Sequence, residues 1–427
     1  MRVWKAEMLP TDWFKRQKAD PKATEQLQDN IEAIVKQVKE NGDKALIEFA
    51  LKFDKAKLTP KTFKAAPEEI KEAYTKVSPQ QVAAINFVKQ KVETFQKQLL
   101  NQTQIETTSD GITVDTLLRP IESVGCYVPG GQAAYPSTLV MTVVPAKIAG
   151  VPRVVVCSPS DTQGKVNSLI LVAADICGVD EVFKVGGAQA IAALAYGTES
   201  IAPVRKIVGP GSKYVTMAKV LVSTDVAIDM PAGPSEVLVL ADESADARLV
   251  SFDLISQAEH GGDSIAALIT TSEKLALQVQ ENLRRIAASA ERGDKISESL
   301  SKYGFIITCN SMEQAIGLVN QFAAEHLEVM TANAKAIAQK LTAGLILIGP
   351  YSPVALSDYG SGTNHVLPTG GFAQAFSGLS ALDFTRRVNI VESSKLGLEK
   401  VKGNIKVLTE AENLPNHYKA IQARFEP

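Results

Sequence analysis

Histidine and cysteine are both scarce in this 427-residue sequence, which contains four of each. The cysteines are widely spaced and form no C-x-x-C pair, at Cys126, Cys157, Cys177 and Cys309. This spacing gives no sign of a disulfide framework or a cysteine metal site, and it predicts buried, reduced thiols in a cytoplasmic protein. A catalytic cysteine is the alternative interpretation, although no obvious base adjoins any of the four.

Long apolar runs and an excess of charge of one sign are absent too. No run approaches the ~20 apolar residues that span a bilayer, and the opening MRVWKAEMLPTDWF lacks the apolar core of a signal peptide. The net charge of -2 gives no electrostatic footprint for nucleic acid or an anionic membrane. With 45% hydrophobic and 22% charged residues, the composition is that of a soluble globular protein, and the length predicts more than one domain.

The common nucleotide-binding motifs are missing as well, since no G-x-G-x-x-G follows an expected strand and no G-x-x-x-x-G-K-[ST] occurs. Two stretches still have the order strand, glycine turn, helix: YVPGGQAAYPS at 127–137 and VGPGSKYV at 208–215. Such turns can present backbone N–H groups to a phosphate. Both can equally be ordinary connections between a strand and a helix. A pyrophosphate cofactor is therefore compatible with the sequence without being established by it.

The hydrophobic pattern divides the chain into three parts. Up to about residue 100, apolar residues recur at helical spacing on a Lys, Gln and Glu background, with a helix stop and a new start at ENGDK, 40–44. From Gly111 to Pro350, short β-branched runs alternate with helical stretches, which predicts βαβ units and parallel sheets. The ranges 120–235 and 236–350 could each form one unit, with PAGPS at 231–235 as the seam.

The last part is less regular. The stretch YSPVALSDYGSGTNHVLPTGG at 351–371 is long, polar and rich in glycine, and such loops are usually functional. The tail from about residue 394 is too small to fold alone, so we expect it to dock on another surface.

All four histidines lie beside carboxylates or amides. In SQAEHGGDS, Gln257 and His260 project from one face at the end of an expected helix and could hold a metal, although Glu259 and Asp263 carry more charge. In AAEHLEV, Glu325 adjoins His326, and a carboxylate beside an imidazole can provide a base and a group that orients it. Neighbouring side chains of a strand point to opposite faces, so both reach one substrate only if the backbone turns there.

The other two histidines lie nearer the C-terminus. SDYGSGTNHVLPTGG contains Asp358 and His365, and EAENLPNHYKA contains Glu412 and His417 on either side of a Pro415 turn. Each of the four stretches alone is also compatible with a solvated surface. Together they indicate one polar site with metal ligands to spare, and the small number of donors suits a catalytic zinc ion with an open coordination position.

These motifs resemble those of the histidinol dehydrogenase family along essentially the whole chain. The resemblance rests on GCYVPGG, YPSTLVMTVVPAKIAGV, GGAQAIAALAYGT, DMPAGPSEVLVLAD, SQAEHGGDS, AAEHLE, SDYGSGTNHVLPTGG and a closing E-x-x-x-x-H. It implies an α/β fold with two incomplete Rossmann-like domains, parallel sheets, a helical N-terminal segment and a small C-terminal tail. The implied boundaries are 1–25 for the N-terminal segment, 26–120 with 236–380 for the domain with the catalytic and zinc residues, 121–235 for the cofactor-binding domain, and 381–427 for a tail that reaches the partner in an intertwined homodimer.

The resemblance also implies roles for individual residues. Zinc, one ion per subunit, would be bound by Gln257, His260, Asp358 and His417. Glu325 and His326 would be the acid and base, and L-histidinol would contact Ser235, His326, His365 and Glu412 beside the metal ligands. NAD⁺ would contact Tyr127 and Gln189; its third contact is commonly asparagine, where this sequence has Ser212.

The implied activity is a zinc-dependent, NAD-linked oxidation of L-histidinol through L-histidinal to L-histidine, in the cytoplasm and without nucleic acid or membrane partners. Three alternatives remain at this point: a zinc hydrolase with Glu325 as base, a relative that oxidises another small polar alcohol, and a binding protein without catalysis. The first would need no nucleotide, and the last would leave the Glu325–His326 pair without a purpose.

Overall fold

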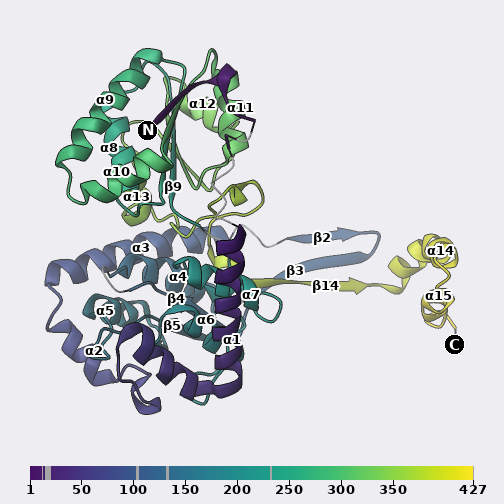
Figure 1. Ribbon diagram of the computed structural model, residues 1–427. Helices are drawn as coiled ribbons and strands as arrows, with labels where there is room; N and C mark the ends of the chain where they lie inside the picture. Colours follow the sequence, from purple (N-terminus) through teal and green to yellow (C-terminus); the bar gives the residue numbers. More distant parts are fainter. Residues whose placement is uncertain (12, 15–20, 102–104, 131–133, 231–232, 427) are drawn as a thin grey trace.

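Two parallel sheets and a projecting antiparallel arm organise the chain (Figure 1). The computed structural model describes residues 1–11, 13–14, 21–101, 105–130, 134–230 and 233–426. The six-stranded sheet has the order β1-β11-β10-β9-β12-β13, and the five-stranded sheet has the order β6-β5-β4-β7-β8. Every strand pair in both sheets is parallel. The α/β class with two Rossmann-like parallel sheets, expected from the sequence, is thereby confirmed.

The six-stranded lobe contains the N-terminal strand and most of the second half of the chain. Its strands are β1 (Arg2–Lys5), β9 (Glu236–Ala241), β10 (Ile265–Thr270), β11 (Phe305–Thr308), β12 (His326–Met330) and β13 (Leu345–Ile348). Its helices are α8 (Ala247–Ala258), α9 (Glu273–Ser289), α10 (Gly293–Lys302), α11 (Met312–Phe322), α12 (Ala334–Ala338) and α13 (Val354–Tyr359). Alternate residues of β9 pack on opposite faces, Val237 and Val239 toward α8 and α9, and Leu238 and Leu240 toward α11.

The five-stranded lobe contains β4 (Ser123–Tyr127), β5 (Arg153–Cys157), β6 (Glu181–Phe183), β7 (Lys206–Val208) and β8 (Ala227–Ile228). Its helices are α1 (Pro21–Phe49), α2 (Pro67–Tyr74), α3 (Pro79–Asn101), α4 (Pro136–Ile148), α5 (Ser168–Cys177), α6 (Gly187–Tyr196) and α7 (Lys213–Val222). Short helical turns occur elsewhere, at Ala6–Met8, Ala50–Asp54, Pro60–Thr62, Phe372–Gln374 and Ala381–Phe384.

The N-terminal helices pack differently from our expectation. We grouped 26–120 with 236–380, but α1 contacts α6 and α7, α2 contacts α5, and α3 contacts α4 and α5, all in the five-stranded lobe. Residues 2–5, which we placed in a helical segment, form β1 and pair with β11. Helical spacing identifies which face of a helix is buried, but it does not identify the sheet against which that face packs. The predicted stop at ENGDK is a kink in α1, where Gly42 has a φ of 52°.

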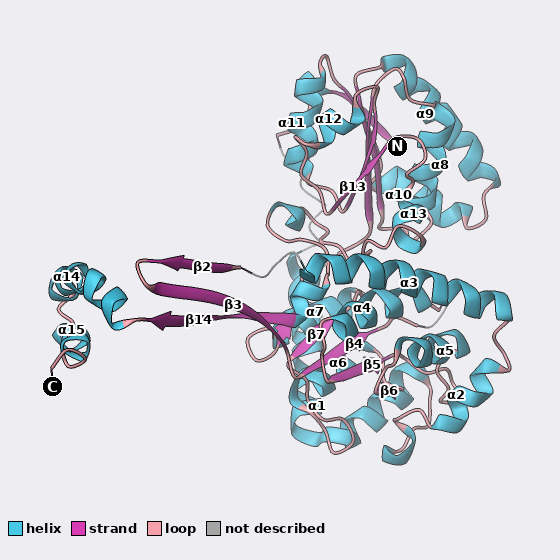
Figure 2. Ribbon diagram, turned by 180° about the vertical axis from the view of Figure 1, so that it is seen from behind, coloured by secondary structure: helices cyan, strands magenta, loops and turns pink. Residues whose placement is uncertain are grey.

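The arm is an antiparallel sheet of order β14-β3-β2, formed by β2 (Glu106–Ser109), β3 (Ile112–Pro120) and β14 (Thr385–Ser393). Helices α14 (Lys395–Ala411) and α15 (Pro415–Gln422) follow at its far end, away from both lobes in Figures 1 and 2. Several large apolar side chains are exposed there, at Ile390, Val391, Leu396, Val407 and Leu408. An exposed apolar surface of this kind is typical of a surface that another molecule covers. Within the described ranges, every helix is too short or too polar to cross a membrane.

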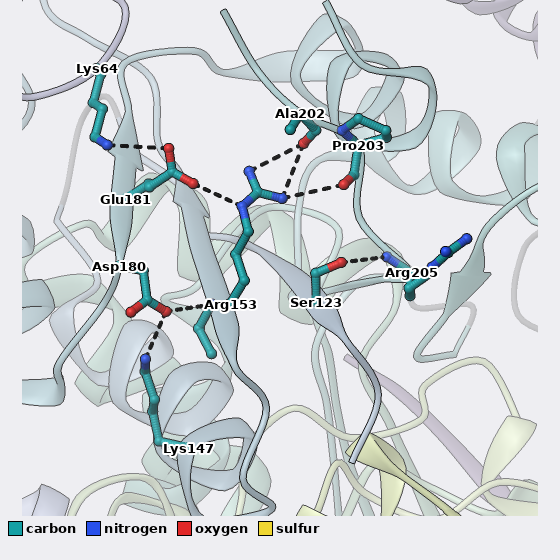
Figure 3. A network of polar contacts seen from close by, with 10 residues as sticks. Lys64, Ser123, Lys147, Arg153, Asp180, Glu181, Ala202, Pro203 and Arg205 are labelled. Atoms are coloured by element: carbon teal, nitrogen blue, oxygen red, sulfur yellow. Dashed lines mark hydrogen bonds and ion pairs between the residues drawn. The ribbon is translucent and has the colours of Figure 1, made fainter. Parts of the chain in front are cut away.

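The two edges of the five-stranded sheet differ in character. At the amino ends of its strands, Arg153 donates to Glu181 at 2.8 Å and to the carbonyls of Ala202 and Pro203 at 3.2 Å (Figure 3). Asp180 accepts from the backbone N–H of Val154 and from Lys147 at 2.7 Å in the same network. At the amino edge, these polar groups are therefore hydrogen-bonded to one another. In open α/β sheets, ligands usually bind at the carboxyl edge, at the point where the strand order reverses. In this sheet that point lies between β4 and β7.

Candidate functional site

The Glu325–His326 pair lies at the start of β12, just after a tight backbone turn. Helix α11 ends at Phe322, and Ala323 then takes a left-handed conformation with a φ of 47°. The backbone bends at Glu325, and Glu325 Oε2 lies 3.5 Å from His326 Nδ1. The turn that we required for the two side chains to meet is present.

A buried glutamate on the neighbouring strand fixes this pair. Glu236, at the start of β9, donates its backbone N–H to Glu325 Oε2 at 2.8 Å, and its own Oε2 accepts from the backbone N–H of Glu325 at 3.3 Å. Its Oε1 accepts from the N–H of Gly370 at 3.0 Å. The sequence analysis did not single out Glu236, although a charged residue that opens the apolar run EVLVLA was the available signal.

The hydrogen bonds of His326 define its tautomer. Nδ1 lies 3.1 Å from the carbonyl oxygen of Glu236, which can only accept, so Nδ1 carries the hydrogen and Nε2 is the basic nitrogen. Nε2 is buried, and among the described residues it has no hydrogen-bond partner. It lies 3.9 Å from Asp358 Oδ1. A buried basic nitrogen without a partner is costly for stability, which points to a role in binding or catalysis.

The two histidines near Asp358 have pKa values shifted in opposite directions. Burial lowers the pKa of His326, but the Glu325 carboxylate, with help from Asp358 and the Glu236 carbonyl, more than offsets this and leaves it above its ordinary value. Burial also lowers the pKa of His365, and here the attraction of Asp358 is too weak to compensate. His326 therefore has the higher proton affinity of the two.

Asp358 and His365 connect the two lobes. Asp358, in α13, places Oδ1 3.7 Å from His365 Nδ1, and His365 Nε2 lies 3.4 Å from the hydroxyl of Thr138 near the start of α4. The adjacent Asn364 donates to the carbonyl of Met141 at 2.7 Å. The amino edge of the six-stranded sheet therefore faces the carboxyl edge of the five-stranded sheet, and the site lies between them.

The end of α8 approaches the same place. Burial raises the pKa of Tyr359, with further contributions from Asp358, Tyr135 and Glu259. Tyr359 ends α13, Glu259 is the C-cap of α8 and Tyr135 is the N-cap of α4. Gln257 is buried and His260 is exposed at this end of α8. Ser235 directly precedes Glu236, at the head of β9.

The donor chemistry of Gln257, His260 and Asp358 suits zinc, which accepts amide and carboxylate oxygen as well as imidazole nitrogen. In the described ranges, no group of three or more His, Cys, Asp or Glu residues could hold a metal ion. Of the three zinc ligands proposed within the lobes of one chain, only His260 and Asp358 are of these residue types, because the third is Gln257. The fit to zinc therefore depends on a fourth ligand from outside the chain's own lobes.

Glu412 and His417 are not brought to this site within the chain. Both are exposed, Glu412 at the end of α14 and His417 in α15, at the far end of the arm. Figures 1 and 2 show these helices well apart from α8 and α13.

The residues proposed for the cofactor lie at the carboxyl edge of the five-stranded sheet. Tyr127 ends β4 and accepts a hydrogen bond from the N–H of Gly187 at 3.1 Å, while the buried Gln189 lies in the first turn of α6. Gly209, after β7, has a φ of 113°, and a Cβ there would collide with the Tyr127 carbonyl oxygen. Ser212 is the exposed N-cap of α7.

This edge fits a pyrophosphate. Ser212 does not cap α7 with a side-chain hydrogen bond, so the first N–H groups of α7 have no such competitor for an anion, whereas the Gly187 N–H at the start of α6 donates to Tyr127. The glycine turn of the YVPGGQ stretch lies partly outside the described residues, at 131–133.

The four cysteines are free and buried, as the sequence predicted. Burial raises the pKa of Cys126 to about 12 and that of Cys309 to about 11. A nucleophilic cysteine needs a lowered pKa, so the alternative of a catalytic cysteine loses its support.

Comparisons with known proteins agree with the sequence motifs. Residues 16–425 match the model of the family described as histidinol dehydrogenase. A histidinol dehydrogenase of Bacteroides fragilis is 44% identical over 418 residues, 97% of each chain. One of Methanothermobacter thermautotrophicus is 43% identical over 393 residues, 92% of each chain. The crystal structure of histidinol dehydrogenase from Elizabethkingia anophelis superimposes with a TM-score of 0.93 at 36% identity, covering 100% of this chain and 98% of that one.

Proposed function

The chain belongs to the histidinol dehydrogenase family, and from this we propose that it oxidises L-histidinol through L-histidinal to L-histidine, with NAD⁺ and one zinc ion per subunit. We place the enzyme in cytoplasmic histidine biosynthesis. The observation that carries the proposal is the buried Nε2 of His326, a base without a partner that faces Asp358 between the two lobes. When bound, NAD⁺ supplies the hydride acceptor, and zinc supplies open positions for the imidazole and amine of the substrate.

His326 is the base of the first step. Its Nε2 takes the proton of the substrate hydroxyl as hydride leaves the carbon, which yields the aldehyde. The Glu236 carbonyl holds Nδ1–H, so the ring keeps one orientation while Nε2 gains and loses the proton. The nearby Glu325 carboxylate favours the imidazolium that forms.

Glu325 acts between the two oxidations. The aldehyde must take up water before it can lose a second hydride, and Glu325 removes a proton from that water. Its Oε2 is engaged by the Glu236 N–H, so Oε1 is the oxygen that we assign to proton transfer. His326 then accepts the hydroxyl proton of the hydrated aldehyde in the second oxidation, and the product is the carboxylate of L-histidine.

The tail completes the site of a partner chain. Glu412 and His417 lie on an arm that points away from the chain's own lobes and exposes apolar side chains. In an intertwined homodimer, His417 would be the fourth zinc ligand of the neighbouring subunit, and Glu412 would contact its substrate. The exposed apolar side chains of the arm would then be covered by the partner.

We expect purified protein to form two NADH per L-histidinol consumed, and to lose this activity after exhaustive chelation and regain it with zinc. The measurement is steady-state absorbance of NADH with product analysis for L-histidine. A zinc hydrolase would form no NADH, and a relative specific for another alcohol would be inactive with L-histidinol. Undiminished turnover in a protein verified to be metal-free would contradict the zinc assignment.

Glu325→Gln should slow the oxidation of L-histidinal more than that of L-histidinol, because only the aldehyde must be hydrated. We expect a loss of about 10²- to 10⁴-fold in the aldehyde step, the range of a positioned general base. The two half-reactions are compared by single-turnover NADH formation from each substrate. Equal losses in both steps would mean that Glu325 acts only through His326, as a group that orients its ring.

A further inference from the structure

A buried ion pair lies at the carboxyl edge of the five-stranded sheet, close to the proposed cofactor residues. Lys219, in α7, contacts Asp229 Oδ1, and the two side chains are 5% and 1% exposed. Charged groups are rarely buried in this way unless they are paired and hydrogen-bonded. Asp229 directly follows β8, and its backbone N–H donates to the carbonyl of Ile207 in β7 at 3.2 Å. The pair therefore joins a helix to the edge of the sheet.

Both charged groups also hold the backbone of Gly209, the residue that follows β7. Asp229 Oδ2 accepts from the Gly209 N–H at 2.8 Å, and Lys219 Nζ donates to the Gly209 carbonyl at 3.0 Å. The Lys219 side chain can reach back along α7 because side chains in a helix tilt toward its N-terminus. The N–H and carbonyl of Gly209 and the two side chains thus form one closed ring of polar contacts.

The backbone of Gly209 is unusual in conformation and lies in a crowded position. Its φ is 113°, a region that other residues rarely adopt, and a Cβ there would collide with the Tyr127 carbonyl oxygen. Strands β4 and β7 are neighbours, with Cys126 opposite Val208, so the chain leaves β7 at Gly209 directly beside Tyr127. The position of Gly209 therefore determines how the loop 209–212 starts from the sheet.

We propose that the Lys219–Asp229 pair is a positioning element for NAD⁺, which holds Gly209 and the loop 209–212 in the conformation in which Tyr127 and Ser212 contact one cofactor. This rests on the proposed function, because the cofactor residues are the ones assigned there. Both side chains of the pair are buried and already paired, so neither contacts the cofactor itself. The pair acts through the backbone of Gly209.

The test measures NADH binding to the full-length, zinc-loaded protein by fluorescence titration, without substrate. Lys219→Met keeps a long side chain and removes the charge and the hydrogen bond to Gly209. A loop that occupies its binding conformation about a tenth of the time binds about tenfold more weakly, and we expect a rise in the Kd for NADH of at least this size. Zinc content should stay at the wild-type level. In steady state, KM for NAD⁺ should rise by a larger factor than kcat falls.

Arg153→Met is the matched control within the same sheet. It also removes a buried charge that holds an acidic partner and backbone carbonyls, but at the amino edge (Figure 3). We expect it to lower the melting temperature and to leave the Kd for NADH unchanged. If Arg153→Met weakens NADH binding as much as Lys219→Met, or if Lys219→Met binds NADH as wild type does, the positioning role is refuted.

Asp229 provides a second, independent set of variants. Asp229→Leu removes the acceptor for the Gly209 N–H and should weaken NADH binding, whereas Asp229→Asn keeps an acceptor and should bind NADH more tightly than Asp229→Leu. Equal affinities in these two variants would contradict a role for that hydrogen bond.

A double variant keeps the test valid if Lys219→Met does not fold. Lys219→Met combined with Asp229→Asn leaves no charge buried alone, and it still lacks the hydrogen bond to the Gly209 carbonyl, so it should bind NADH weakly. Wild-type affinity in the double variant would refute the positioning role. A wild type that does not bind NADH would overturn both this inference and the proposed function, whereas normal NADH binding in wild type and in every variant would overturn this inference alone.

Discussion

His326→Asn should lower kcat by about two to four orders of magnitude while zinc content stays at the wild-type level. The reason is specific to the two ring nitrogens. The Asn side chain has an N–H that can still donate to the Glu236 carbonyl in place of Nδ1–H, so the local structure is preserved. It has no basic nitrogen to replace Nε2, which is the atom assigned to proton transfer.

Zinc analysis and initial rates of NADH formation on the same preparation test this prediction together. Both oxidation steps should slow, because His326 accepts a proton in each. Loss of zinc in the Asn variant would identify His326 as a ligand and contradict its assignment as the base. A turnover close to wild type would contradict a direct role in the chemistry.

His417→Ala should deplete zinc, although the residue lies on the arm, far from the chain's own lobes. We expect the fall in zinc affinity to exceed the roughly 10–100-fold loss caused by an outer-shell partner, because a direct ligand is removed. Zinc content after gel filtration and titration with a zinc-buffered chelator provide the measurement. Normal zinc content would remove His417 from the ligand set.

Mixing this variant with His326→Asn tests whether the sites are shared. In a mixed dimer, one site combines the intact lobes of the first chain with the intact tail of the second, and the other site combines both defects. Random exchange of subunits at equal amounts therefore predicts about a quarter of wild-type activity, from two preparations that are nearly inactive alone. If no activity returns although mixed dimers form, each site draws its tail from its own chain.

The order of strands and helices could be predicted from the sequence because each element carries its own pattern. The runs that became β9 and β10 are apolar and bounded by turns, as buried parallel strands require. The packing of α1 to α3 could not be predicted, since an amphipathic helix does not specify its sheet. The same limit applies to β1, a four-residue strand whose partner β11 follows in the sequence only after the whole five-stranded lobe.

The candidate site was predictable to a similar degree. Adjacent residues such as Glu325 and His326 stand out in the sequence, and their meeting needed only a local bend of the backbone at Glu325. Glu236 was missed because its hydrogen-bond partners, Glu325 and Gly370, lie on other parts of the chain. A charged residue at the start of the apolar run EVLVLA was its local sign.

The buried cysteines have a practical consequence for following the stability of each lobe. Cys126, Cys157 and Cys177 lie in the five-stranded lobe, and Cys309 directly follows β11 in the six-stranded lobe. Alkylating reagents attack exposed thiolates, so each cysteine is modified only when its surroundings open. Timed alkylation followed by peptide mass spectrometry would therefore report the opening of the two lobes separately, with no added label.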